Sequence, residues 1–136
     1  MPETLKLEIV TPEAIVYSEQ VQMVTLPAVE GQMGVLPRHV PLLTQIVPGE
    51  MIVRRDGRET FLAVGEGLVL ITADGVAIVT DMAVASENID EAKAEEARQR
   101  AAARLRDKIA DEEVASVNAS LARSLAQLKV KRRRRA

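Results

Sequence analysis

The stretch AVASENIDEAKAEEARQR, residues 83 to 100, is where the sequence changes character. Before Ser86, short apolar runs are separated by glycine and proline. After Ser86 neither glycine nor proline occurs, and the good helix formers Ala, Glu, Arg, Lys, Leu and Gln dominate. We therefore predict two structural units, a strand-rich unit of residues 1–86 and a helical unit of residues 87–136.

Two apolar stripes at helical spacing run through the second unit. The first stripe is mostly alanine, so its helix must pack closely against another element to be stable. Ser86 or Asn88 is expected to cap the first helix, and Asp111 to cap the second. The first stripe comprises Ala94, Ala97, Ala101, Leu105 and Ile109. The second comprises Val114, Val117, Leu121, Leu125 and Leu128. These stripes predict an antiparallel hairpin of two helices.

The first unit shows the period-two alternation of half-buried strands. Leu5, Leu7 and Ile9 alternate with charged residues, and the run from Val21 to Leu26 is expected to place Val21, Met23 and Thr25 on one face. Two Asp-Gly pairs, at 56–57 and 74–75, separate apolar runs and predict hairpin turns with positive φ. The predicted fold class is α+β, an N-terminal antiparallel β-sandwich, or flattened barrel, followed by the C-terminal helical hairpin.

Composition excludes several classes of protein. The chain has no cysteine, which rules out a disulfide framework, a thiolate metal site and a cysteine nucleophile. No run approaches the roughly 18 apolar residues that span a bilayer, and the N-terminus lacks the features of a signal peptide, so we expect a cytoplasmic protein. Residues 1–86 hold eleven acids and five bases, hence a net charge of −6; residues 87–136 hold nine acids and thirteen bases, hence +4. This asymmetry indicates different partners for the two units.

The segment EGQMGVLPRHVPLL, residues 30 to 43, is unusually constrained for a loop. Its glycines are followed by Pro37 instead of the Lys and Ser or Thr of a phosphate-binding loop. The only histidine, His39, has Arg38 and aliphatic residues as neighbours, which disfavours an acid–base role. The GEG at 65–67 lies between strands and indicates a bulge or a close packing contact. We expect no catalytic residue and no metal site, and favour a rigid surface for a protein partner.

Three segments together resemble the epsilon subunit of bacterial and chloroplast rotary ATP synthases: EGQMGVLPRHVPLLTQIVPG, ETFLAVGEGLVLI and SLARSLAQLKV. The resemblance implies a non-catalytic central-stalk subunit of the proton-translocating enzyme, peripheral on the cytoplasmic face of the plasma membrane. It also implies a sandwich that docks on the gamma subunit and the c-ring. Many members of the family carry an acid where this chain has Gln32. The docking residues implied are Gly31, Gln32, Gly34, Pro37, Arg38, His39 and Pro41.

The segment IDEAKA, residues 89 to 94, resembles a segment through which some epsilon subunits bind ATP. Lys93 replaces an arginine of that segment, and Gln127 stands where a later arginine is expected. Because lysine lacks the planar fork of arginine, we expect regulatory MgATP to bind weakly or undetectably and no other cofactor to be used. Helix capping and solvated charge are the alternative interpretation of these residues. The candidate ATP-binding residues are Ile89, Asp90, Lys93, Ala94, Arg100, Arg104 and Arg123.

The C-terminal run KVKRRRRA could suggest nucleic acid, but the protein is acidic overall and contains only Tyr17 and Phe61 as aromatics. The resemblance instead implies that the hairpin extends to acidic segments of the alpha and beta subunits and restrains ATP hydrolysis. A free-standing nucleotide-responsive module is the alternative function. The candidate inhibitory contacts are Arg98, Arg106, Lys129, Lys131, Arg132, Arg133, Arg134 and Arg135.

Overall fold

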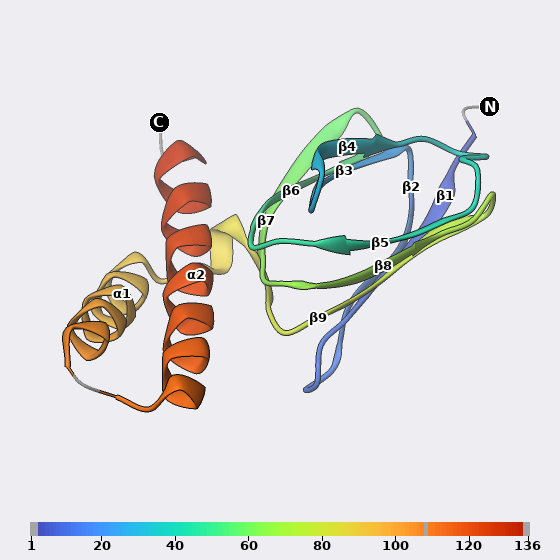
Figure 1. The fold of residues 1–136 in the computed structure, drawn as a ribbon. Helices are drawn as coiled ribbons and strands as arrows, with labels where there is room; N and C mark the ends of the chain where they lie inside the picture. The colour runs from blue at the N-terminus through green and yellow to red at the C-terminus, as the bar shows by residue number, and fades with distance from the viewer. Residues whose placement is uncertain (1–2, 108, 135–136) are drawn as a thin grey trace.

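The computed structural model describes residues 3–107 and 109–134, and within them it confirms the predicted fold class (Figure 1). A β-unit of ten strands is followed by a 3₁₀ turn and two helices. The strands are β1 (Leu5–Val10), β2 (Ile15–Val21), β3 (Met23–Ala28), β4 (Gly31–Val35), β5 (Leu42–Ile46), β6 (Gly49–Arg55), β7 (Arg58–Val64), β8 (Gly67–Ile71), β9 (Gly75–Thr80) and β10 (Ala83–Ala85).

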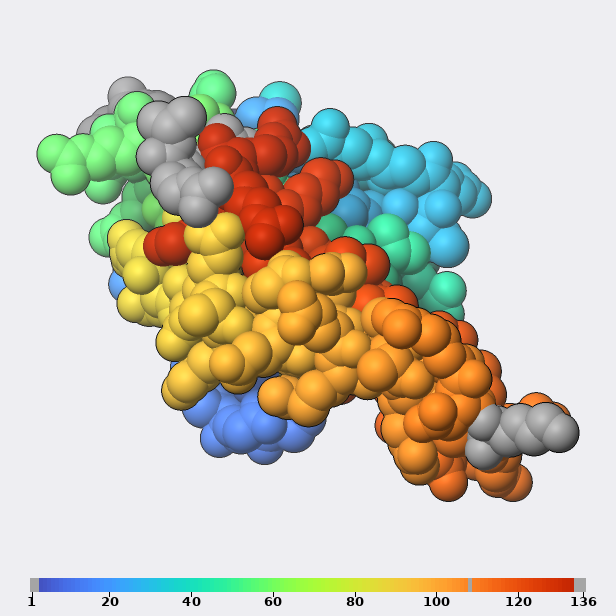
Figure 2. Space-filling model, turned by 90° about the vertical axis from the view of Figure 1, so that its left-hand side faces the viewer, coloured from blue at the N-terminus to red at the C-terminus, as the bar shows by residue number. Residues whose placement is uncertain are grey.

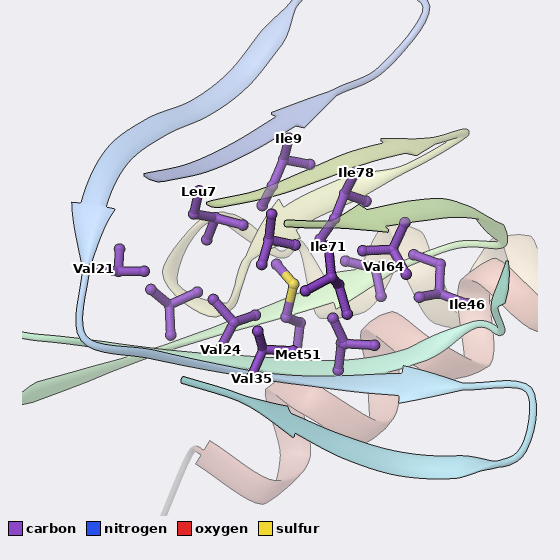
Figure 3. Packing of buried hydrophobic residues seen from close by; sticks show 14 of the residues in the cluster. Leu7, Ile9, Val21, Val24, Val35, Ile46, Met51, Val64, Ile71 and Ile78 are labelled. Carbon is purple, nitrogen blue, oxygen red and sulfur yellow. The ribbon is translucent and has the colours of Figure 1, made fainter. Parts of the chain in front are cut away.

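The strands form two layers around one aliphatic core. One layer contains β10, β7, β6, β3 and β4, and the other contains β5, β8, β9, β1 and β2. The predicted alternation of β1 is confirmed, because Leu5, Leu7 and Ile9 are all buried. Figure 3 shows Leu7 and Ile9 directed toward the same interior as side chains from the facing strands. One pairing departs from the antiparallel prediction, since β1 and β9 run parallel.

The prediction that Val21 and Met23 lie on the same face of one strand is wrong, because the strand is interrupted at Gln22. The strand β2 ends at Val21 and β3 begins at Met23, while the Gln22 N–H donates to the Arg54 carbonyl at 2.8 Å. The break shifts the alternation by one residue, so Val21 is buried together with Val24 instead of sharing a face with Met23. The chain passes from one layer to the other at this point.

Both Asp-Gly hairpins form, but only one uses the predicted backbone conformation. At the β6–β7 turn Asp56 has φ 53° and Gly57 has φ 75°, as a type I′ turn requires. At the β8–β9 turn neither Asp74 nor Gly75 has a positive φ. Gly75 serves a different purpose, because an added Cβ would lie 2.5 Å from the Lys6 carbonyl oxygen. The missing side chain lets β1 pair beside β9.

The GEG segment makes the close packing contact that its sequence indicates. A Cβ on Gly65 would overlap the carboxylate of Asp81, and a Cβ on Gly67 would overlap the backbone of β9 at Val79. Both glycines therefore permit tight packing of the β7–β8 connection, Gly65 against Asp81 and Gly67 against the end of β9. This packing fixes the position of Asp81 beside the hairpin.

The hairpin consists of η1 (Ser86–Asn88), α1 (Glu91–Arg106) and α2 (Asp111–Arg134). The predicted cap is wrong by two residues or more: Ser86 and Asn88 lie in the preceding turn, and the carboxylate of Asp90 accepts from the Lys93 N–H at 3.1 Å. Asp111 is the first residue of α2. No helix in the described part of the chain is long and apolar enough to cross a membrane.

The second apolar stripe differs from the prediction near the C-terminus. Leu125 is 47% exposed, whereas Ala126, Leu128 and Val130 are buried. The reason is that α2 packs against two neighbours, α1 and the strands β6 and β7, so its buried face is wider and turned relative to a stripe that meets one helix. In the first stripe Ala94 and Ala101 are buried, as predicted.

Candidate functional site

An exposed apolar surface covers the outer side of β5, β8 and β9. Leu43 pairs with Leu70, and Leu68 pairs with Val79, so the four side chains are neighbours on one face. Their exposed fractions are 65%, 48%, 51% and 60%, respectively. We call these four residues the apolar sheet face. Contiguous exposed aliphatic side chains of this kind mark a protein-docking surface in soluble proteins.

The hairpin packs against the other layer of the β-unit. Ala126 and Val130 of α2 form a small buried cluster with Ala63 of β7 and with Ile89, which precedes α1. Half-buried Phe61, Met82 and Val84 surround this cluster. Figure 2, viewed from the hairpin side, shows α1 in yellow to orange lying in front of the rest of the molecule. Since α2 covers β6 and β7, the hairpin leaves the apolar sheet face open.

The predicted docking residues do not form one surface, because β4 separates them. Gly31, at φ 125°, begins β4 opposite Ala28, which also pairs with Ile46. The loop of residues 36–41 follows the other end of β4, where the Arg38 N–H donates to the Ala73 carbonyl at 3.0 Å. Gly31 and Gln32 thus begin β4, and Pro37, Arg38, His39 and Pro41 lie in the loop after its other end. Figure 1 shows that the β3–β4 turn and the loop between β4 and β5 are at opposite ends of the strands.

The loop of residues 36–41 is fixed by its own contacts. Arg38 has a positive φ of 65°, and its guanidinium pairs with the carboxylate of Glu3 at 3.0 Å. The His39 Nδ1 lies 2.7 Å from the Val40 carbonyl oxygen. Leu36 and Val40 are 57% and 71% exposed. These contacts leave apolar side chains on a constrained loop, which suits a docking role.

The candidate ATP-binding residues have other partners in the folded hairpin. Asp90 caps α1, and Ile89 and Ala94 are buried at 5% exposure. Lys93 is exposed on α1. The guanidinium of Arg123 pairs with Asp81 at 3.1 Å instead of facing these residues. The side chains that the resemblance assigns to a nucleotide are therefore mostly used for capping, packing and ion pairing.

Two of the candidate bases do lie at one cavity. A cavity of about 260 Å³ between the helices is lined by Arg100 and Arg104 of α1 and by Ser116 and Ser120 of α2. Arg104 also pairs with Glu113 at 2.6 Å, which supplies a counter-ion from α2. A larger cavity of about 770 Å³, between β2 and the β10–η1 segment, contains none of the predicted site residues among its lining residues.

Three of the candidate inhibitory bases, Arg98, Arg132 and Arg133, pair with acids of the same chain. Arg132 pairs with Glu91 at 2.9 Å and with Glu95 at 3.2 Å. Arg98 hydrogen-bonds to Glu95, and this contact lowers the pKa of that carboxyl from 4.5 to about 2. The same contact raises the pKa of Arg98. In the folded hairpin Arg132 therefore joins α2 to α1, whereas the Arg98 contact lies within α1.

The bases nearest the C-terminus also reach the β-unit and its connection. Arg133 pairs with Glu50 at 3.2 Å, and the Glu50 side chain is only 5% exposed. The Lys131 ammonium donates to the Ser86 carbonyl at 3.1 Å. Lys129 is exposed, as is Arg106 at the end of α1. The backbone of Arg134 ends α2, and Arg135 lies outside the described residues.

The sequence did not lead to a prediction of the acids, Glu50 and Asp81, that pair with the bases of α2. Glu50 was recognisable as the single charge in the apolar run GEMIV, where a buried carboxylate requires a partner. Asp81 gave no such signal, because its role depends on the distant Gly65 and on Arg123. Tertiary packing alone places Glu50 beneath α2 and Asp81 beside it.

Family models match the chain in two consecutive parts. Residues 4–86 match the beta-sandwich domain of the ATP synthase delta/epsilon chain, and residues 87–132 match the long alpha-helix domain of the same chain. The ATP synthase epsilon chain of Herpetosiphon aurantiacus is 40% identical over 131 residues, which cover 96% of each chain. That of Halorhodospira halophila is 41% identical over 128 residues, covering 93% of this chain and 91% of the relative.

Two solved structures share the fold. A chain of the mitochondrial ATP synthase of Euglena gracilis, in a structure of OSCP, F1 and the c-ring, superposes with a TM-score of 0.76 at 24% identity. The match covers 95% of this chain and 81% of that chain. A chain from the central stalk and c-ring of the Tetrahymena thermophila mitochondrial ATP synthase superposes with a TM-score of 0.67 at 11% identity. At these identities the likeness concerns the fold alone.

Proposed function

This chain belongs to the ATP synthase delta/epsilon chain family, and we propose that it couples rotation of the gamma subunit to the c-ring and restrains ATP hydrolysis through its hairpin. Its relatives are epsilon chains, so it is an accessory subunit of the ATP synthase and not a catalytic one. The proposed position is peripheral, on the cytoplasmic face of the membrane, as part of that complex. The two activities are assigned to different units.

The apolar sheet face is the proposed contact with gamma, and it is the observation that carries the coupling role. Leu43, Leu68, Leu70 and Val79 project from strands that the core holds rigidly, and the hairpin does not cover them. Burial of exposed aliphatic surface supplies the free energy of association, and rigid strands lose little entropy on docking. A surface that transmits torque needs both properties.

The c-ring contact is proposed for one end of the β-unit only. A ring that meets the end with Gly31 and Gln32 cannot also meet the loop of residues 36–41, because β4 and the core lie between them. Gln32 brings no charge to such a contact, whereas Arg38 brings one that is already paired with Glu3. The contact at either end therefore depends on shape and apolar side chains more than on charge.

Restraint of hydrolysis is proposed for the hairpin in an extended state. Among the described residues, the buried cluster between the hairpin and the β-unit comprises four, Ala63, Ile89, Ala126 and Val130, against seventeen in the core of the β-unit, so undocking exposes far less apolar area than opening that core would. Once free, the bases of α2 can meet acidic segments of the alpha and beta subunits. Regulatory MgATP would act on the same equilibrium, weakly, because Lys93 gives a single ammonium where a guanidinium would give two parallel hydrogen bonds.

Charge placed on the apolar sheet face tests the proposed function. We expect Leu68→Asp combined with Leu70→Asp to abolish co-purification with the gamma subunit from solubilised membranes, because two carboxylates would be desolvated at the interface. Ile15→Asp is the control, since Ile15 is 63% exposed but lies on β2, outside this face. Retention of gamma by the double variant, with an unchanged circular-dichroism spectrum, would contradict the docking assignment.

A further inference from the structure

Two ion pairs join α2 to the β-unit on either side of their apolar contact. Arg123 pairs with Asp81 at 3.1 Å, and Arg133 pairs with Glu50 at 3.2 Å. The two arginines are ten residues apart on α2, a separation of about 15 Å along a helix. Ala126 and Val130, which are buried against Ala63, lie between them in the sequence. The pairs therefore stand at both ends of the contact.

Both acids belong to the β-unit, whose backbone positions them for the arginines of α2. Asp81 lies against Gly65, where any side chain would overlap its carboxylate, and its N–H donates to the Glu66 carbonyl at 3.3 Å. Glu50 belongs to β6 and has a side chain that is 5% exposed beneath α2. Fixed acceptors lose little entropy when an arginine arrives, and a carboxylate covered by α2 requires a charged or hydrogen-bonding partner.

We propose that Glu50 and Asp81 form an electrostatic latch that sets the equilibrium between the docked and undocked hairpin. Arg123 and Arg133 then have two mutually exclusive sets of acidic partners, one on the β-unit and one on another subunit. The latch itself is a property of the isolated chain. The competition between the β-unit and another subunit for the two arginines rests on the proposed restraint of hydrolysis.

The latch predicts opposite consequences for the acids and for the bases. Neutralising Glu50 and Asp81 frees the hairpin but leaves every base available to a partner. Neutralising Arg123 and Arg133 also frees the hairpin but removes two of the charges that a partner would bind. Acid variants should therefore strengthen restraint of hydrolysis, and base variants should not. A merely structural role for these pairs would weaken both states alike.

The docked fraction can be measured on the isolated full-length chain. Because the sequence has no cysteine, Ala77→Cys on β9 and Asn118→Cys on α2 provide two unique, exposed positions for spin labels. We expect Glu50→Gln with Asp81→Asn to raise the undocked population, seen as a second distance in pulsed electron resonance, on the order of tenfold. The matched control is Glu19→Gln with Glu59→Gln, which removes two acids whose pairs, with Arg55 and Arg54, lie within the β-unit.

An exchanged pair separates the latch from general destabilisation. Asp81→Arg combined with Arg123→Asp should restore the single docked distance that each single change broadens. Thermal unfolding followed by circular dichroism verifies that each variant folds. A distance distribution that the acid variants leave unchanged, or that the control alters equally, would overturn the latch.

The same acid variants in the reconstituted synthase test the competition. We expect ATP hydrolysis to fall at least about threefold below that of the synthase with the natural chain. The reason is that a tenfold larger undocked population provides more hairpin that can bind the alpha and beta subunits. If the hairpin undocks in the isolated chain but hydrolysis does not fall, the latch stands and the proposed restraint of hydrolysis fails.

Discussion

The core of the β-unit and the contact between α2 and that unit differ in the side chains that they bury. The core packs leucine, isoleucine, valine and methionine from both layers, such as Leu7, Met51 and Ile71, each fully buried. The contact with the hairpin buries only Ile89, Ala126 and Val130 of the described part of that unit and adds ion pairs at its margins. Burial of many large aliphatic side chains makes the free energy of opening the core large. A small apolar contact with ion pairs at its margins costs much less free energy to open. This difference supports the proposal that the hairpin can undock while the β-unit stays folded.

The largest effect is expected in the core. Ile71→Ala should lower the free energy of unfolding of the β-unit by about 2–5 kcal/mol, because it leaves a cavity among fully buried neighbours. Urea unfolding followed by circular dichroism measures this loss. Leu70→Ala is the control, since Leu70 is adjacent on β8 but 48% exposed, and it should change stability by less than about 0.5 kcal/mol. Equal losses for the two variants would contradict the assigned core.

Deletion of the whole hairpin should cost less than that one core substitution. A chain lacking residues 88–136 loses the small cluster around Ala63, and we expect its β-unit to lose about 1–2 kcal/mol. It should still co-purify with gamma and support coupled synthesis, while ATP hydrolysis by the reconstituted enzyme rises. A truncated chain that cannot fold or assemble would show that the two units are not separable.

A smaller effect is expected at the candidate nucleotide site. Lys93→Arg should strengthen weak MgATP binding by on the order of 1 kcal/mol, because a guanidinium makes paired hydrogen bonds to phosphate. Titration calorimetry on the isolated chain measures the change. Lys129→Arg, at an exposed position of α2 outside the candidate nucleotide set, serves as the control. Tight binding by the natural chain that Lys93→Arg leaves unchanged would show that lysine is no handicap.

The smallest effect concerns acid stability of the hairpin. The pKa of Glu95 is lowered from 4.5 to about 2, first by its hydrogen bond to Arg98. A lowered pKa means that this carboxylate stabilises the folded hairpin above pH 4.5 and that its contribution is lost as the pH falls through about 2. Helical circular dichroism should therefore decline less over this range in Glu95→Gln than in the natural chain. Identical acid titrations would contradict a stabilising role for this pair.

Sequence patterns predicted what depends on neighbours along the chain. The alternation in β1, the turn at Asp56 and Gly57, and the change of structure after Ser86 all follow from local periodicity and backbone preference. The backbone conformation at Asp74 and Gly75 was not predicted, because it depends on the close approach of β1, a parallel strand about seventy residues away in the sequence. Turn preferences of neighbouring residues carry no information about that long-range strand pairing.

The candidate sites show the same limit. Arg123 and Arg133 were predicted as ligands of nucleotide and partner, and their docked partners, Asp81 and Glu50, come from distant strands and turns. The docking residues around His39 were predicted as one surface because they are adjacent in sequence, but a five-residue strand carries the chain from one end of the β-unit to the other. Adjacency in sequence did not imply adjacency in space.

Hydrogen exchange of the full-length chain, followed by mass spectrometry in low and high salt, tests most directly whether the hairpin opens at a lower free energy than the β-unit. We expect amides of α1 and α2 to exchange at least about a hundredfold faster than those of the core strands, since the hairpin opens without unfolding the β-unit. Raised salt should accelerate exchange in the helices alone, because it screens the ion pairs that hold them. A single exchange rate shared by helices and core strands, unaffected by salt, would contradict a permanent β-unit with an adjustable hairpin.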